Sequence, residues 1–86
     1  RMKILIPSAL HSYTGGARTE ADGATLAEVL ADLERRHPGI RFRMIDEQGR
    51  IRRHIRFFAG GSQVFELTQA LAPADELIIV QALSGG

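Results

Sequence analysis

The 86-residue chain contains no cysteine, and this is the absence with the widest consequences. Without cysteine the chain has no disulfide, no thiolate nucleophile, no persulfide on a side chain and no cysteine-ligated metal. The chain has three histidines, which lie far apart in the sequence: His11, His37 and His54. None of them has another histidine or a cluster of carboxylates at the spacing that metal ligands require. We therefore predict that the chain holds no metal.

Strong charge of one sign and long hydrophobic runs are missing as well. The net charge is +1, which argues against a general attraction to nucleic acid or to a membrane surface. No apolar run approaches the ~20 residues that a membrane span requires, and no signal-type segment is visible. A chain this short forms one hydrophobic core, so we expect one cytoplasmic domain. Arg1 precedes Met2, and we expect Met2 to be the natural start.

The clearest local signal predicts a helix. Thr25 and Glu28 have the spacing of a capping box, in which two side chains satisfy backbone amides at a helix start. The residues that follow repeat at helical spacing on one face: Leu26, Val29, Leu30 and Leu33. Pro38-Gly39 then ends the pattern. We predict a helix from Thr25 to His37 whose apolar stripe covers a sheet.

Five short runs have strand character, and four of them form two antiparallel pairs. A wide loop with a turn at Tyr13–Gly16 separates the first pair, and Gly60-Gly61 separates the second, which favours a tight hairpin. The fifth run is apolar on both faces, as expected of the middle strand of a sheet. The predicted strands are Lys3–Ile6, Ala17–Ala21, His54–Phe58, Ser62–Phe65 and Leu77–Val80. The sequence thus predicts an α+β fold with a mixed five-stranded sheet.

A single main helix covers one face of such a sheet and leaves the other face open. By strand alternation we place Leu5, Phe58 and one parity of Leu77–Val80 on the open face, with Arg56 beside them; His54 shares this parity. The face could bind a partner. It could equally be an ordinary surface, because scattered exposed hydrophobic residues are normal in proteins.

From Arg41 to Arg53 the chain is polar and rich in arginine, which predicts a long connection with little regular structure. The dense basic cluster comprises the arginines at 41, 43, 50, 52, 53 and 56. It could guide docking onto an acidic enzyme or bind an acidic ligand, but we favour a solvated loop because charge-rich loops are usually simply exposed. Asp46 and Glu47 lie in a turn without a partner base, so we assign them no acid–base role.

This order of elements, from Lys3 to Gly86, resembles the β-grasp (ubiquitin-like) sulfur carriers. That family includes the thiamine sulfur carrier, the small subunit of molybdopterin synthase and the carrier of one cysteine-synthesis pathway. The matching features are Ile6-Pro7, Tyr13-Thr14-Gly15-Gly16, the helix ending in Pro38-Gly39, the strand after Arg52-Arg53, Ala74-Asp75-Glu76-Leu77 and the terminal Gly85-Gly86. The connection Arg41–Arg53 looks more like that of the cysteine-synthesis carriers than that of the shorter thiamine carrier.

The resemblance implies a domain over residues 2–81 and a flexible tail over 82–86, in which Leu83, Ser84 and Gly85 lead to the reacting residue Gly86. An E1-like enzyme would adenylate the Gly86 carboxylate with ATP, and sulfur would displace AMP to give a thiocarboxylate. The chain would be a carrier and not an enzyme, and it would bind no cofactor itself. Its partners would be the E1-like enzyme and a sulfur acceptor such as a cysteine synthase or the large subunit of molybdopterin synthase.

Three other functions remain open for a chain with this fold. A ubiquitin-like modifier would use the same adenylated Gly86 but would end in an isopeptide bond to a lysine. A small subunit of a molybdopterin-synthase-like complex would bind one large catalytic partner stably. A plain interaction module would not need Gly85-Gly86 at all. We favour sulfur carriage, and the tail is the deciding feature: the terminal Gly85-Gly86 has no Cβ atoms to obstruct a narrow channel that leads to a nucleotide phosphate.

Overall fold

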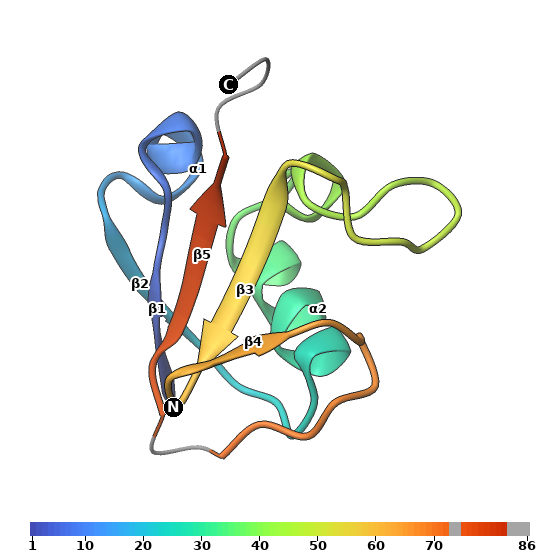
Figure 1. Cartoon of the computed structure of the whole chain (residues 1–86). Coiled ribbons are helices and arrows are strands. Elements are labelled where there is room, and N and C mark those ends of the chain that lie inside the picture. Colours follow the sequence, from blue (N-terminus) through green and yellow to red (C-terminus); the bar gives the residue numbers. More distant parts are fainter. Residues whose placement is uncertain (73–74, 83–86) are drawn as a thin grey trace.

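The computed structural model describes residues 1–72 and 75–82, so the predicted tail residues Leu83, Ser84, Gly85 and Gly86 lie outside the described part. Five strands form one sheet in the order β2-β1-β5-β3-β4, and the helix α2 packs on one face of it (Figure 1). The strands are β1 Met2–Leu5, β2 Arg18–Ala21, β3 Ile55–Ala59, β4 Ser62–Val64 and β5 Leu77–Gln81. The α-helices are α1 His11–Thr14 and α2 Leu26–Arg36, and the 3-10 turns are η1 Ser8–Leu10 and η2 Arg41–Arg43.

The last strand is the middle strand of the sheet, as predicted. β5 runs parallel to β1 and antiparallel to β3, while the pairs β1–β2 and β3–β4 are antiparallel. Burial alternates along β5: Leu77 and Ile79 are buried towards α2, and Ile78 is half-buried on the other face. The predicted α+β, β-grasp arrangement is confirmed.

The helix α2 begins and ends where the caps predict. Thr25 Oγ1 accepts a hydrogen bond from the Glu28 amide at 3.2 Å, and Glu28 Oε1 accepts from the Ala24 amide at 2.8 Å. In a standard capping box the Glu28 side chain would accept from the amide of the N-cap Thr25, but here it accepts from the amide of Ala24, the residue before the N-cap. At the other end, His37 Nε2 lies 3.0 Å from Thr19 Oγ1 of β2. Both ends of the helix are thus tied to neighbouring chain.

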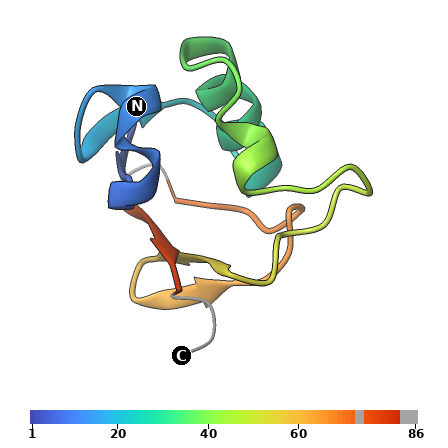
Figure 2. The same cartoon turned by 90° about the horizontal axis from the view of Figure 1, so that it is seen from above.

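Figure 2 shows α2 beside one face of the sheet. The hydrophobic core is made of side chains from the helix and from the strands. The predicted helix stripe is completely buried: Leu26, Val29, Leu30 and Leu33. It packs in one cluster with the inward side chains of the strands, among them Ile4, Phe57, Leu77 and Ile79. Burial of this apolar surface is the main favourable term in folding. Among the described residues, no helix has the length and apolar character that a membrane crossing needs.

The β3–β4 hairpin turns at two glycines, as predicted. Gly60 has φ 59° and Gly61 has φ 82°, and two consecutive positive φ angles favour glycine in a two-residue hairpin. A Cβ on Gly60 would lie 2.7 Å from an Asp75 carboxylate oxygen, so the Asp75 side chain would have to move to make room for it. β4 ends at Val64, one residue earlier than expected, and Phe65 is exposed.

Two connections differ from the sequence prediction. The loop between β1 and β2 contains η1 and α1, and Leu10 from this segment joins the core. The arginine-rich connection is not merely a solvated loop: Ile40, Met44 and Ile45 are fully buried. A bridge between Ile45 and Ile51 closes it into a short turn. Met44 and Ile45 of this connection face the core although Phe42 beside them is exposed, so the charge content alone was a misleading guide.

Candidate functional site

The predicted tail starts at the central strand of the sheet. β5 ends at Gln81, and the amide of Ala82 donates a hydrogen bond to the His54 carbonyl oxygen at 2.8 Å. Figure 1 shows that this end of β5 lies between α1 and the connection that precedes β3. The predicted reacting residue Gly86 lies outside the described residues, as do Leu83, Ser84 and Gly85. The site is therefore built from what surrounds the end of β5.

A hollow of about 410 Å³ adjoins this end of β5, and we name it the β5-exit hollow. Its lining comes from η1, from the arginine-rich connection and from β5 itself: Ala9, Leu10, Phe42, Arg43, Arg52, His54 and Gln81. The Arg52 guanidinium stacks 4.6 Å from the centre of the Phe42 ring, and Arg52 Nε donates to the Phe42 carbonyl oxygen at 2.8 Å. These two contacts orient one positive charge beside the root of the tail.

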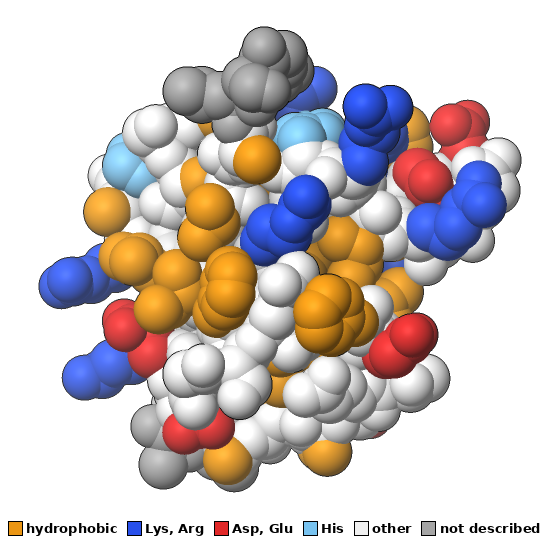
Figure 3. Space-filling view, in the orientation of Figure 1, with side chains coloured by type: hydrophobic (Ala, Val, Ile, Leu, Met, Phe, Trp, Pro, Cys, Tyr) orange, Lys and Arg blue, Asp and Glu red, His pale blue; other side chains and the backbone are white. Residues whose placement is uncertain are grey.

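The open sheet face carries the apolar row that the sequence predicted. Leu5 pairs with Ile78, and Ile78 pairs with Phe58, so three neighbouring strands place these half-buried side chains side by side. Val80 is 39% exposed and pairs with Arg56. Figure 3 shows hydrophobic side chains gathered over this face with basic side chains among and around them. The placement of these residues is as predicted, and their role in binding a partner stays a prediction.

Arg56 and His54 occupy different surroundings, although alternation along the predicted strand would place both side chains on the same face of the sheet. The Arg56 guanidinium donates to the carbonyl oxygens of Arg53 and Ile55, which holds it against the start of β3. β3 begins at Ile55, so His54 precedes the strand and lines the β5-exit hollow. Sequence alternation alone did not assign His54 to that hollow, because its lining is assembled from separate segments.

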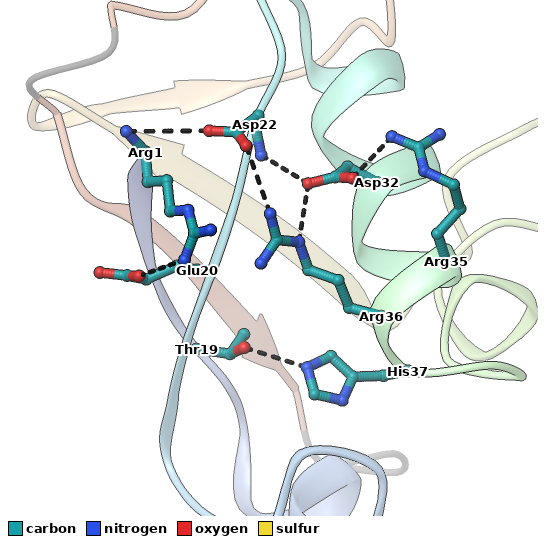
Figure 4. A network of polar contacts seen from close by, with 8 residues as sticks. All are labelled: Arg1, Thr19, Glu20, Asp22, Asp32, Arg35, Arg36 and His37. Carbon is teal, nitrogen blue, oxygen red and sulfur yellow. Dashed lines mark hydrogen bonds and ion pairs between the residues drawn. The ribbon is translucent and has the colours of Figure 1, made fainter.

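Asp32 is the only polar or charged residue that is buried in the described part of the chain. It accepts from the Asp22 amide at 2.8 Å, from Arg36 Nε at 2.8 Å and from Arg35 at 2.6 Å (Figure 4). The Asp22 amide, followed by the Arg36 side chain, lowers the pKa of Asp32 to about 2. Its oxygens are fully engaged, so Asp32 braces α2 against the chain that leaves β2 and takes no part in chemistry.

Asp46 is likewise occupied by its own turn. Its carboxylate accepts from the amides of Gln48 and Arg50, both at 2.9 Å. The Arg50 amide is the main reason why the pKa of Asp46 lies below its usual range. Within residues 1–72 and 75–82, no three histidine or acidic side chains gather as metal ligands. Around the end of β5, the described surface consists of guanidinium groups, an aromatic ring and apolar side chains. Such a surface is suited to contact with another protein.

Comparison with known proteins gives close relatives over the whole chain. The ThiS family matches residues 4–86. The sulfur carrier protein CysO of Mycobacterium tuberculosis is 34% identical over 89 residues, which cover 96% of each chain. A chain in the crystal structure of the Amycolatopsis orientalis BexX/CysO complex has a TM-score of 0.90 and 32% identity, with both chains covered completely.

An archaeal protein with a different name has the same fold. The crystal structure of SAMP1 from Haloferax volcanii, a small archaeal modifier protein, has a TM-score of 0.78 and 30% identity. The match covers 99% of this chain and 98% of SAMP1. The family match spans nearly all of the sequence, and the fold agrees with it. The chain therefore belongs to the ThiS family, the β-grasp sulfur carriers that its sequence resembles.

Proposed function

We propose that this chain carries sulfur as a thiocarboxylate on Gly86 and donates it in a biosynthetic pathway. The observation that supports this most is the similarity to CysO, a sulfur carrier, over 96% of both chains, together with a family match that extends to Gly86. The fold adds support, because the central strand β5 leads directly to the Gly-Gly end. The strand that precedes the tail, β5, is itself paired with β1 on one side and with β3 on the other.

The chemistry needs activation, because a carboxylate is a poor electrophile. A Gly86 carboxylate oxygen attacks the α-phosphorus of ATP in an E1-like enzyme, and pyrophosphate leaves. Sulfide then attacks the acyl carbon, AMP leaves, and a thiocarboxylate remains on the chain. The chain supplies the reacting terminus and the docking surface, and the enzyme supplies the ATP site. Adenylation consumes ATP, which fits the cytoplasmic location that we expect from the sequence.

The open sheet face is our proposed contact for the activating enzyme. Leu5 and Phe58 form a half-buried apolar row with Ile78, and Arg56 stands beside Val80 on the same face. An apolar centre with an arginine at its rim is typical of protein interfaces. For the sulfur acceptor, the similarity to CysO and the form of the Arg41–Arg53 connection favour a cysteine synthase over the large subunit of molybdopterin synthase.

A second candidate is a ubiquitin-like modifier that is joined through Gly86 to protein lysines. The similarity to SAMP1, a small archaeal modifier protein, supports it. Both functions share the adenylated intermediate, so adenylation alone does not separate them. Higher-mass conjugates of the chain in extracts of its own cells, lost when Gly86 is deleted, would favour the modifier.

The adenylation step has a direct test in ATP–pyrophosphate exchange. An E1-like enzyme is mixed with ATP, labelled pyrophosphate and either the wild type or a chain lacking Gly86. We expect label to enter ATP only with the wild type. The shortened chain still ends in a glycine carboxylate, that of Gly85, but this group is one residue closer to β5 along the chain and should fall short of the α-phosphorus. Equal exchange with both chains, or none with several competent E1-like enzymes, would contradict the proposal.

A further inference from the structure

The short distance between β5 and the reacting carboxylate limits where an enzyme can sit. Residues 82–86 follow β5, and an extended chain spans at most about 3.6 Å per residue. Gly86 can therefore reach no farther than about 18 Å from the end of β5. If Gly86 is the reacting residue, as proposed above, the enzyme that acts on it must approach the surface around Gln81. This inference rests on that proposed function.

The surface around Gln81 is the β5-exit hollow, which differs in character from the apolar open face. Arg43, Arg52 and His54 line it together with Phe42. The Arg52 guanidinium is held in place from two sides, by the Phe42 ring and by the Phe42 carbonyl oxygen. An oriented guanidinium loses little rotamer entropy when it binds a carboxylate, which favours recognition of carboxylates by geometry.

The two arginines that line this hollow form no ion pair within the described part of the chain. Among the described residues, ion pairs are formed by Arg1, Arg35, Arg36 and Arg50. None of these ion pairs involves Arg43 or Arg52. Asp46, an acid of the same connection, is occupied by the amides of its own turn and by Arg50. Two guanidinium groups beside the root of the tail are thus available to an acidic partner.

The exposure of the lining favours a protein over a small anion. Phe42 is 56% exposed, although a large aromatic side chain gains most from burial. Small-molecule sites enclose roughly 70–90% of their ligand, whereas exposed aromatic and arginine side chains together are typical of protein-binding hot spots. We propose that the β5-exit hollow docks carboxylate side chains of the E1-like enzyme that activates Gly86, with Arg43 and Arg52 as the recognising groups.

The test is the steady-state kinetics of adenylation with this chain as the varied substrate, at low and at physiological ionic strength. Arg43→Glu reverses one charge at the hollow, and no side-chain hydrogen bond or ion pair of Arg43 is found in the described part of the chain. We expect KM for the chain to rise about tenfold while kcat changes little, because docking and not chemistry is impaired. The double variant with Arg52→Glu is expected to raise KM further and to weaken its salt dependence.

Arg50→Glu is the matched control. It makes the same charge change in the same connection, but Arg50 does not line the hollow. Equal KM increases for Arg43→Glu and Arg50→Glu would overturn the inference, because they would show general charge attraction only. An unchanged KM for Arg43→Glu and for the double variant would overturn it as well.

Two further outcomes separate this inference from its alternatives. If the wild type itself is not adenylated by several E1-like enzymes, the proposed function fails and this inference fails with it. If AMP alone shifts the NMR signals of Arg52 and His54 while KM is unaffected by the arginine variants, the hollow binds a small anion and the docking proposal is overturned. Adenylation of the wild type with a KM that depends on Arg43 supports both proposals.

Discussion

The backbone amide of Ala82 donates to the carbonyl oxygen of His54 at 2.8 Å, one residue beyond the last strand pair of β5 with β3, Gln81 with Ile55. This bond joins the root of the tail to a residue that lines the β5-exit hollow. Ala82 is also the first of the residues 82–86 that follow β5 and form the predicted tail. The hydrogen bond thus fixes the first residue of the predicted tail, whose last residue is the proposed reacting group Gly86, to the folded domain.

Replacing Ala82 by proline removes that donor without disturbing the extended chain before it. We expect a loss of about 1 kcal/mol in the free energy of unfolding, the usual contribution of one hydrogen bond. We expect a larger effect on adenylation, with kcat/KM reduced because the tail starts from a less ordered root. Urea unfolding and adenylation kinetics measure the two effects. Ala82→Ser keeps the amide and should match the wild type; a proline variant with unchanged kcat/KM would show that this anchor does not matter.

Substitution of Phe58 tests the open sheet face. Phe58→Ser removes the aromatic side chain from the row that it forms with Ile78 and Leu5. We expect KM for the activating enzyme to rise about tenfold, as for a typical interface hot spot, with kcat nearly unchanged. Phe58→Leu keeps an apolar contact and should restore most of the affinity. Circular dichroism confirms that both variants are folded before the kinetics are compared, and equal KM values for all three chains would contradict a partner-binding role.

The pKa of Asp32 predicts a specific loss of stability in acid. Its folded pKa is about 2, below the ordinary 3.8, so its contribution is complete above pH 3.8 and is lost as the pH falls towards 2. Asp32→Asn should lower stability at pH 6 and flatten the decline between pH 4 and 2. Part of the decline should persist, because backbone amides also lower the pKa of Glu34 and Asp46. Urea unfolding at several pH values measures this, and parallel pH profiles for both chains would refute it.

The arginine-rich connection should behave as part of the core. Ile45 is fully buried, so Ile45→Ala is expected to cost about 2–4 kcal/mol through lost burial and the cavity left behind. Arg50→Gln, at an exposed position of the same connection, should change stability by less than about 0.5 kcal/mol. Equilibrium unfolding in urea compares them. A cost below about 1 kcal/mol for Ile45→Ala would mean that the connection is only loosely packed.

Local signals explain which parts of the fold the sequence predicted. The helix bounds followed from Thr25 and from the break at Pro38-Gly39, which act within one turn of chain. The central position of β5 followed from its apolar residues on both faces, because only a covered or paired strand tolerates them. Gly60-Gly61 predicted the hairpin because their backbone conformation is nearly reserved for glycine.

The missed features depend on tertiary contacts. η1 and α1 span three and four residues, too few for a helical period to show in the sequence. The buried Met44 and Ile45 stand among arginines, so average polarity hid them. The β5-exit hollow combines residues from separate segments that are spread between positions 9 and 81, and no local pattern brings them together. The proposed role of Gly86 came from family resemblance and not from any pattern of burial or spacing.

The central claim is tested most directly by intact-protein mass spectrometry. The wild type and a chain lacking Gly86 are each incubated with an E1-like enzyme, ATP and sulfide, and their masses are compared. We expect a mass gain equal to the exchange of one oxygen for sulfur in the wild type alone. No sulfur gain on the wild type with several competent E1-like enzymes, or the same gain on the chain lacking Gly86, would contradict it.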